Sequence, residues 1–230
     1  AGIREGVRRL PMDGRTTICN MAVEMSGRTG IMPTDETLLG YLKGRAQWPV
    51  EPVGSDPDAT FANRMAVDVS TLEPMVAFPH KPANAVPFSR IPDMMARSQT
   101  QPSPDLPPVT SDRITDGFVG ACTNGRYDDL VEVAKVLKGN TVHRDVSLVV
   151  IPASRKVYER AMDEGILQVI IKAGANVESS NCGPCFGSHM GVLWRNAQMI
   201  SSSNRNYQGR MGSRDARIFL RTRTARAGTR

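Results

Sequence analysis

Gly117-Phe-Val-Gly-Ala-Cys122-Thr-Asn-Gly125 is the stretch of this 230-residue sequence that says most about its fold. The apolar run over residues 117–121 is typical of a short buried strand. Apolar side chains then recur at positions i, i+3, i+4 and i+7 from Leu130, and Gly139 follows in the place of a helix C-cap. The stretch therefore predicts a strand, a turn that carries Cys122 and a helix, in that order.

The same alternation continues through the second half of the chain. Residues 147–151, Ser-Leu-Val-Val-Ile, predict a second strand, and residues 157–164 predict a second helix. Residues 169–173 are apolar but too short to assign to either class. Strands that alternate with helices indicate an α/β fold, and no internal repeat is visible.

The first half is organised differently. Residues 12–45 predict mostly helix with a loop at 30–35, and residues 65–70 alternate like a short strand. Four prolines between positions 74 and 87 exclude a long regular element, and four more within residues 98–111 predict a stiff linker. The expected organisation is a first domain at 1–97, the Pro-rich linker at 98–111, a second domain with the cysteines at 112–220, and a disordered Arg-rich tail at 221–230.

Charge and hydropathy narrow the functional class. The formal net charge is +6 at pH 7, but residues 201–230 hold eight arginines and one aspartate, so the rest of the chain is nearly neutral. Basic charge confined to a tail does not indicate a nucleic-acid-binding face, and nucleic acid is not an expected partner. No apolar run approaches the roughly 20 residues that span a bilayer, no secretory signal is visible, and the cytosol is the expected compartment. The sequence begins with Ala, which predicts a processed chain or a piece of a longer one.

Three of the four cysteines form the most specific chemical signal. Cys182 and Cys185 stand in the motif Cys-Gly-Pro-Cys, and Cys122 is a single distant thiol. Three such ligands can hold a metal or a cluster and leave one coordination position open, which produces a Lewis acid catalyst. Cys19 lies within a helical apolar pattern and is interpreted as core packing.

Other chemistries use the same residues. Cys-Gly-Pro-Cys is also the active-site tetrapeptide of thioredoxin-like thiol–disulfide oxidoreductases, although here it lies late in the chain and leaves Cys122 unexplained. His189 follows Cys185 by four residues and would complete a Cys3His zinc site, but structural zinc sites usually contain two close pairs. A non-catalytic metal-binding or RNA-binding fragment is the remaining class.

A set of motifs occurs in a fixed order along the chain. They are Thr17-Ile-Cys-Asn-Met-Ala-Val-Glu24, Asp35-Glu-Thr37 with Tyr41-Leu-Lys-Gly-Arg45, Leu72-Glu-Pro74, Gly120-Ala-Cys-Thr-Asn-Gly-Arg126, Cys182-Gly-Pro-Cys185 with Gly187-Ser-His-Met-Gly191, and Ser203-Asn-Arg-Asn-Tyr-Gln-Gly-Arg-Met-Gly212. Each motif alone is moderately specific, and the ordered set is highly specific. On these motifs, the chain resembles the large subunits of 3-isopropylmalate dehydratase and homoaconitase, within the aconitase superfamily.

The resemblance implies an aconitase-type architecture and a [4Fe-4S] cluster held by Cys122, Cys182 and Cys185. In this family the fourth iron has no protein ligand and binds the hydroxyl and a carboxylate of the substrate. Arginine suits a carboxylate substrate because its planar fork binds both oxygens. The resemblance also implies five residues beside the cluster: the catalytic Glu24, Arg205 and Arg210, and the cofactor-contacting Asn20 and Asn204.

The implied activity is that of a hydro-lyase, which dehydrates and rehydrates a hydroxy dicarboxylate or tricarboxylate. 3-Isopropylmalate in leucine biosynthesis is the first expectation, with homoaconitate, citramalate and dimethylmalate as alternatives. Family large subunits are roughly twice this length, and their N-terminal domain supplies His and Asp residues to the active site. The serine that takes the proton belongs to a small subunit with a swivelling domain, which is the expected partner. Little hydratase activity is therefore expected from these 230 residues alone.

Overall fold

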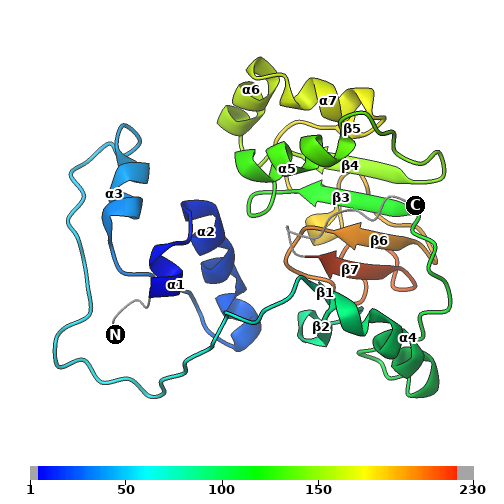
Figure 1. Cartoon of the computed structure of the whole chain (residues 1–230), viewed down its shortest axis with the longest axis horizontal. Coiled ribbons are helices and arrows are strands. Elements are labelled where there is room, and N and C mark those ends of the chain that lie inside the picture. Colours follow the sequence, from blue (N-terminus) through cyan, green and yellow to red (C-terminus); the bar gives the residue numbers. More distant parts are fainter. Residues whose placement is uncertain (1–4, 222–230) are drawn as a thin grey trace. The chain divides into compact units, whose positions relative to one another are not determined.

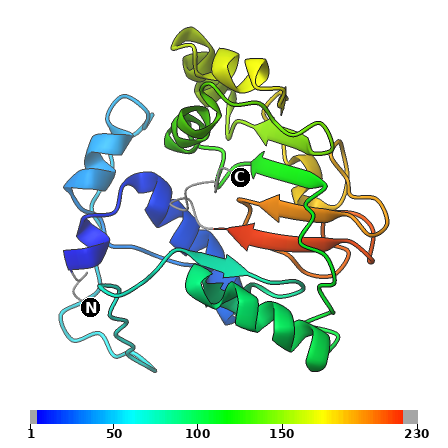
Figure 2. The same cartoon turned by 45° about the vertical axis from the view of Figure 1, so that its right-hand side comes forward.

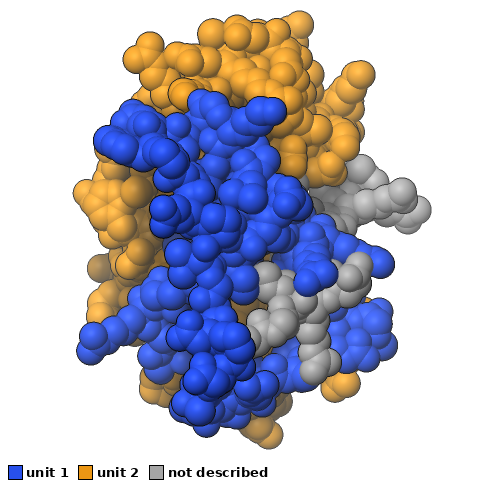
Figure 3. All heavy atoms as spheres, turned by 90° about the vertical axis from the view of Figure 1, so that its left-hand side faces the viewer, with its two compact units in different colours: residues 1–72 blue, residues 73–230 orange. Residues whose placement is uncertain are grey.

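The computed structural model describes residues 5–221. The chain forms two compact units, of which unit 1 ends at Leu72 and unit 2 begins at Glu73 (Figure 3). None of the helices within residues 5–221 combines the length and the apolar character needed to cross a membrane.

Unit 1 is built from short helices: α1 (Glu5–Arg8), α2 (Met12–Met21), the 3-10 helix η1 (Ala22–Met25) and α3 (Glu36–Leu42) (Figure 1). The helices expected within residues 12–45 are therefore confirmed. Residues 65–70 form no strand, contrary to the expectation. Their apolar side chains at 65, 67 and 69 are exposed, so this alternation has no core to face.

A buried arginine ties α3 to α2. Arg15 Nη1 donates to Asp35 Oδ1 at 2.7 Å, and Arg15 Nε donates to Leu10 O at 3.0 Å. Asp35 is also the N-cap of α3, because the same carboxylate accepts the Leu38 N–H at 3.1 Å. The Arg15 guanidinium, together with that N–H, holds the pKa of the Asp35 carboxyl below its usual value. The start of α3 is thus fixed by a charged, hydrogen-bonded cap.

Unit 2 contains a seven-stranded sheet (Figure 1, Figure 2). Its strands lie in the order β2-β1-β7-β6-β3-β4-β5. The five strands from β7 to β5 are parallel, and β1 and β2 extend them in antiparallel fashion, which confirms the α/β class. The strand bounds are β1 (Met75–Ala77), β2 (Ala85–Pro87), β3 (Asp116–Gly120), β4 (Ser147–Ile151), β5 (Asn176–Val177), β6 (Gln198–Ser201) and β7 (Arg217–Arg221).

Helices cover one face of this sheet and long loops cover the other. The helices are α4 (Ile91–Thr100), α5 (Tyr127–Leu137), α6 (Arg155–Asp163) and α7 (Ile166–Lys172), with the 3-10 turns η2 (Pro82–Asn84), η3 (Phe88–Arg90) and η4 (Gly183–Phe186). α5, α6 and α7 pack around Val150, and α4 packs in the cluster that contains Phe219. Because successive strand residues point to opposite faces of the sheet, the strand residues next to Val150 and Phe219 in the sequence point away from the helices and form another core. That core joins strands to loops through Phe118, Val149, Ile151, Met199, Ile218, Leu193 and Met211.

The Pro-rich segment at 98–111 does not divide the units. Leu106 and Val109 are buried in the core beside α4. Ser98 Oγ accepts the Val109 N–H at 3.1 Å, and Gln99 Nε2 donates to Val109 O at 2.8 Å. The prolines therefore shape a packed strap on unit 2, and the division falls after Leu72 instead.

The strand–turn–helix expected around Cys122 is confirmed by β3 and α5. The second expected strand and helix are β4 and α6, and residues 169–173 fall mostly within α7. Of the tail expected to be disordered, residues 221–230, Arg221 instead ends strand β7, and the rest lies outside the described residues.

Candidate active site

The connectivity of the sheet creates a natural ligand site beside β3. The chain runs from β3 outward through β4 to β5, and then returns to the other side of β3 to form β6 and β7. The connections that leave β3 and β6 therefore diverge at their carboxyl ends. Open α/β sheets bind ligands at such a switch point. Cys122 follows β3 by two residues, and Asn204 follows β6 by three.

Asn124 joins these two strand ends. Its Nδ2 donates to Ser202 O at 2.5 Å and to Asn204 Oδ1 at 2.6 Å. Ser202 Oγ in turn accepts the Gly120 N–H at 3.1 Å. Asn204 is buried, and Arg205 next to it is half-buried. The loop after β6 is thus fastened to the turn that carries Cys122.

The turn after β3 lies directly against the end of β4. Gly125 N donates to Ala121 O at 2.9 Å, which closes the turn, and Ala153 N donates to Gly125 O at 2.8 Å. A Cβ at Gly125 would overlap Ile151 O, so a side chain is excluded there. The Cys122 side chain is exposed in this turn.

The second cysteine segment is held against the same isoleucine. Cys185 N donates to Cys182 O at 3.1 Å in η4, and Asn181 Oδ1 accepts the Gly183 N–H at 2.5 Å. Gly183 has φ of +52°, and a Cβ there would overlap Ile151 Cδ1. Both cysteine segments therefore pack on Ile151, one on its carbonyl oxygen and one on its side chain.

The pKa of the Cys185 thiol depends on the two other thiols and on one arginine. Burial raises the pKa of the Cys185 thiol, and Arg210 opposes this rise by charge and by a hydrogen bond. The thiols of Cys182 and Cys122 both lie near enough to raise the same pKa further. Arg210 Nε donates to Cys185 O at 2.7 Å, which fixes the arginine beside the cysteine turn. Four of the expected site residues thus share one end of the sheet.

Asn206 holds the loop that carries Arg205 and Arg210. It is fully buried, and its Nδ2 donates to Phe78 O at 2.8 Å and to Ile218 O at 3.1 Å. Asn206 was not singled out from the sequence, and Asn124 was expected only as a helix cap, a position that Arg126 occupies. Their partners are far away along the chain, so composition and spacing contain no signal for these bonds.

Asn20 and Glu24 belong to unit 1. Asn20 is in the last turn of α2 and Glu24 is in η1, four residues later. This spacing places them on one side of a nearly continuous helical segment. Both are half-buried. Their expected place beside the cysteines stays a prediction.

Among residues 5–221, no group of three or more His, Cys, Asp or Glu side chains is arranged to hold a single metal ion. His189 is exposed, and its backbone has φ of +70°. The zinc site of Cys3His type considered from the sequence is therefore not formed in this part of the chain.

Comparison with known proteins gives a consistent family. The model of the aconitase family (aconitate hydratase) matches residues 2–224. Large subunit 1 of 3-isopropylmalate dehydratase from Methanopyrus kandleri is 44% identical over 94% of this chain and 47% of its own length. The corresponding large subunit from Desulfitobacterium hafniense is 41% identical over 94% of this chain and 47% of its own. The methanogen homoaconitase large subunit of Methanocaldococcus jannaschii is 40% identical over 94% of this chain and 49% of its own length. The chain thus spans about half the length of the curated relatives it matches.

Proposed function

Because this chain belongs to the aconitase family, we propose that it is the cluster-binding part of a hydro-lyase large subunit. The proposed reaction is the dehydration and rehydration of a hydroxy dicarboxylate or tricarboxylate. 3-Isopropylmalate is the first candidate substrate, as in leucine biosynthesis, and homoaconitate is the second, after the names of the relatives. The observation that supports this best is the packing of both cysteine segments on Ile151, next to Arg210.

The donor set fits an iron–sulfur cluster. Cys122, Cys182 and Cys185 would hold it, because thiolates are the usual protein ligands of such clusters. The thiols of Cys182 and Cys122 both act on the pKa of the Cys185 thiol, which supports placing the three at one site. When bound, a [4Fe-4S] cluster with one iron free of protein ligands supplies a Lewis acid that weakens a C–O bond without redox change.

Arg210 has two tasks in this proposal. It lies against the cysteine turn through its bond to Cys185 O, and its positive charge lowers the pKa of the Cys185 thiol against the effect of burial. The thiolate form is the one that binds metal, so this charge favours cluster assembly. The same guanidinium would bind a substrate carboxylate in fork geometry.

Arg205 and Asn204 complete the proposed pocket from the loop after β6. Removal of a proton next to a carboxylate builds negative charge on that carboxylate, and Arg205 would stabilise it. The bond from Asn124 fixes the Asn204 amide. By the family resemblance, Glu24 of unit 1 would hydrogen-bond the oxygen that leaves, and Asn20 would contact the cofactor.

A small subunit is the proposed partner, since the relatives are named as large subunits. It would contribute the swivelling domain and the base that takes the proton. The cytosol stays the proposed compartment.

Anaerobic reconstitution with iron and sulfide tests the proposal. The wild-type chain should take up about four iron atoms and develop a visible chromophore, whereas Cys122→Ser should lose the cluster because one of three ligands is missing. Cys19→Ser is the control, since this half-buried thiol lies in unit 1 and the proposal gives it no iron to bind. Equal iron uptake by wild type and Cys122→Ser would contradict the proposed ligand set.

The same variant separates the second candidate function. Cys182 and Cys185 share one turn, and Cys182 is exposed, so a dithiol reaction has a structural basis. A thiol–disulfide oxidoreductase would keep its activity in Cys122→Ser. If the wild-type chain reduces disulfides catalytically and binds no iron, the oxidoreductase replaces the hydro-lyase.

A further inference from the structure

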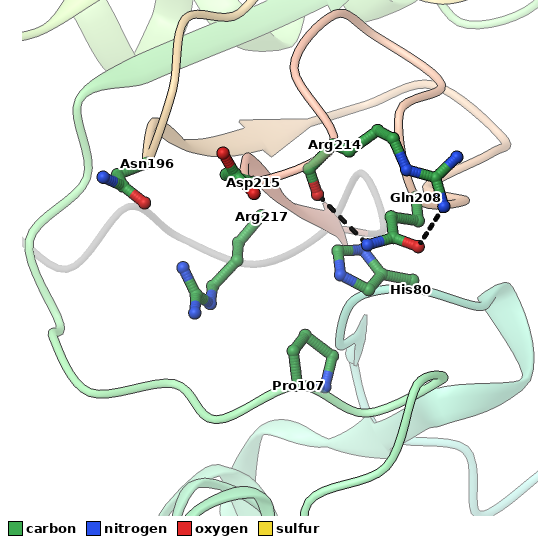
Figure 4. Close-up of a pocket in the computed structure, with 7 residues that line it drawn as sticks. All are labelled: His80, Pro107, Asn196, Gln208, Arg214, Asp215 and Arg217. Atoms are coloured by element: carbon green, nitrogen blue, oxygen red, sulfur yellow. Dashed lines mark hydrogen bonds between the residues drawn. The ribbon is translucent and has the colours of Figure 1, made fainter.

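A polar pocket lies in unit 2 at the ends of the strands that are opposite the cysteine turns. Arg217 begins β7, and Asn196 precedes β6 by two residues, so both lie at the amino ends of parallel strands. The cysteine turns follow the carboxyl ends of this sheet. The pocket has a volume of about 180 Å³, and His80, Gln208, Arg214 and Asp215 also line it (Figure 4).

His80 is the least expected residue of this pocket. Only 6% of its surface is exposed, and its Nδ1 is buried without a hydrogen-bond partner among the residues that the structure describes. Its backbone N–H donates to Asp105 O at 2.6 Å, which fixes the main chain but not the ring. A buried polar nitrogen without a partner is unfavourable, and such groups often mark a missing ligand.

Charge determines which ligand fits. Burial lowers the pKa of His80, and the positive charges of Arg217 and Arg214 lower it further, while Asp105 opposes them. Both guanidiniums therefore act on the imidazole, and a cation would be repelled. Asp215 is the one acidic lining residue, and its carboxylate also lies 3.5 Å from Arg195 Nε.

The two arginines are already positioned. Arg217 Nε donates to Pro108 O at 2.9 Å, and Arg214 Nη2 donates to Gln208 Oε1 at 3.0 Å (Figure 4). Bonds of this kind reduce the entropy that a guanidinium loses when it binds a ligand.

We propose that this pocket binds a small oxygen-bearing anion, a phosphate or a carboxylate group, at a site separate from the cysteines. The forked guanidinium of Arg217 matches two anion oxygens, and the Arg214 guanidinium, which is turned toward Gln208 (Figure 4), adds positive charge. The amides of Asn196 and Gln208 add donors, and His80 Nδ1 becomes satisfied by donating to the anion.

Titration of the purified chain with inorganic phosphate, and separately with malonate, tests the site by calorimetry at constant ionic strength. One or both anions should bind, and Arg217→Gln should weaken that binding about tenfold because a charged hydrogen bond is lost. Arg195→Gln is the matched control. It removes the same charge close to Asp215, but Arg195 does not line the pocket.

The pKa of His80, measured by NMR, gives a second readout, which does not depend on removing an arginine charge. The chain has three histidines, so His80→Gln assigns the His80 signal. The bound anion stabilises the imidazolium, so the pKa of His80 should rise in its presence while those of the other two change little. Absence of binding up to about 50 mM anion, which is about 50-fold above the upper end of usual KM values, or equal weakening by Arg195→Gln and Arg217→Gln, would overturn the proposal. Preference for phosphate or for malonate identifies the anion class.

Discussion

At the scale of single residues, side-chain amides hold the candidate active site together. Asn124 joins the turn after β3 to the loop after β6, and Asn206 joins that loop to β1 and β7. Each donates to the backbone carbonyl of a segment far away along the chain. The sequence patterns indicated the charged and thiol groups but not these amides, because Asn124 and Ser202 are 78 residues apart. A hydrogen bond of that range is visible only in the folded chain.

Asn206→Ala tests this role of an amide. The change leaves Phe78 O and Ile218 O without their donor, so the free energy of unfolding should fall by about 1–3 kcal/mol. Urea denaturation of unit 2 measures it. Asn140→Ala is the control: its Nδ2 donates to Val136 O at 2.8 Å on an exposed surface, and the expected change is within about 0.5 kcal/mol. Equal losses in the two variants would show that Asn206 has no special structural part.

At the scale of elements, the decisive feature is the approach of two cysteine segments to one residue of β4. The turn after β3 contacts Ile151 O, and η4 contacts Ile151 Cδ1. At Gly125 a Cβ would overlap the backbone oxygen of Ile151, so glycine is required there. At Gly183 a Cβ would meet the movable Cδ1 of Ile151, and φ of +52° adds backbone strain. Both cysteine segments thus lie against the same isoleucine.

A double-mutant cycle tests the contact between η4 and β4. Gly183→Ala should impair cluster assembly and lower stability, since the new methyl meets Ile151 Cδ1 at a φ of +52°. Ile151→Val removes that Cδ1, so the double variant should recover part of the loss. The readout is iron content after reconstitution together with the thermal midpoint.

Gly139→Ala provides the control for backbone strain alone. Gly139 has φ of +78° with nothing within 4 Å of a new Cβ, so about 1–2 kcal/mol of strain is expected without loss of iron. Strictly additive effects of Gly183→Ala and Ile151→Val would contradict the contact.

The elements also show which parts of the fold local patterns can predict. β3, α5, β4 and α6 were predicted to within a few residues, because each has apolar periodicity and clear end signals. β6 and β7 were missed. Both strands are short, and β7 has an arginine at each end. They are strands because β7 pairs with β1 and β6 pairs with β3, and their local composition does not indicate this.

At the scale of the whole molecule, the chain spans about half the length of its curated relatives. By the family resemblance, the proposed reaction would need residues from a further domain and from a small subunit. The 230-residue chain alone should therefore bind a cluster but hydrate 2-isopropylmaleate at least about 1,000-fold more slowly than an assembled enzyme, since one missing catalytic group costs that much. Absorbance of the unsaturated acid measures it. Rapid turnover by this chain alone would show that no partner is needed.

The central claim, that three distant thiols hold one cluster, is tested most directly by anomalous X-ray diffraction at the iron edge. The measurement needs crystals of the anaerobically reconstituted chain. The account predicts one compact iron peak in contact with the sulfurs of Cys122, Cys182 and Cys185, on the side of Arg210. Iron bound only at the Cys182–Cys185 pair, with the Cys122 sulfur directed away, would contradict it.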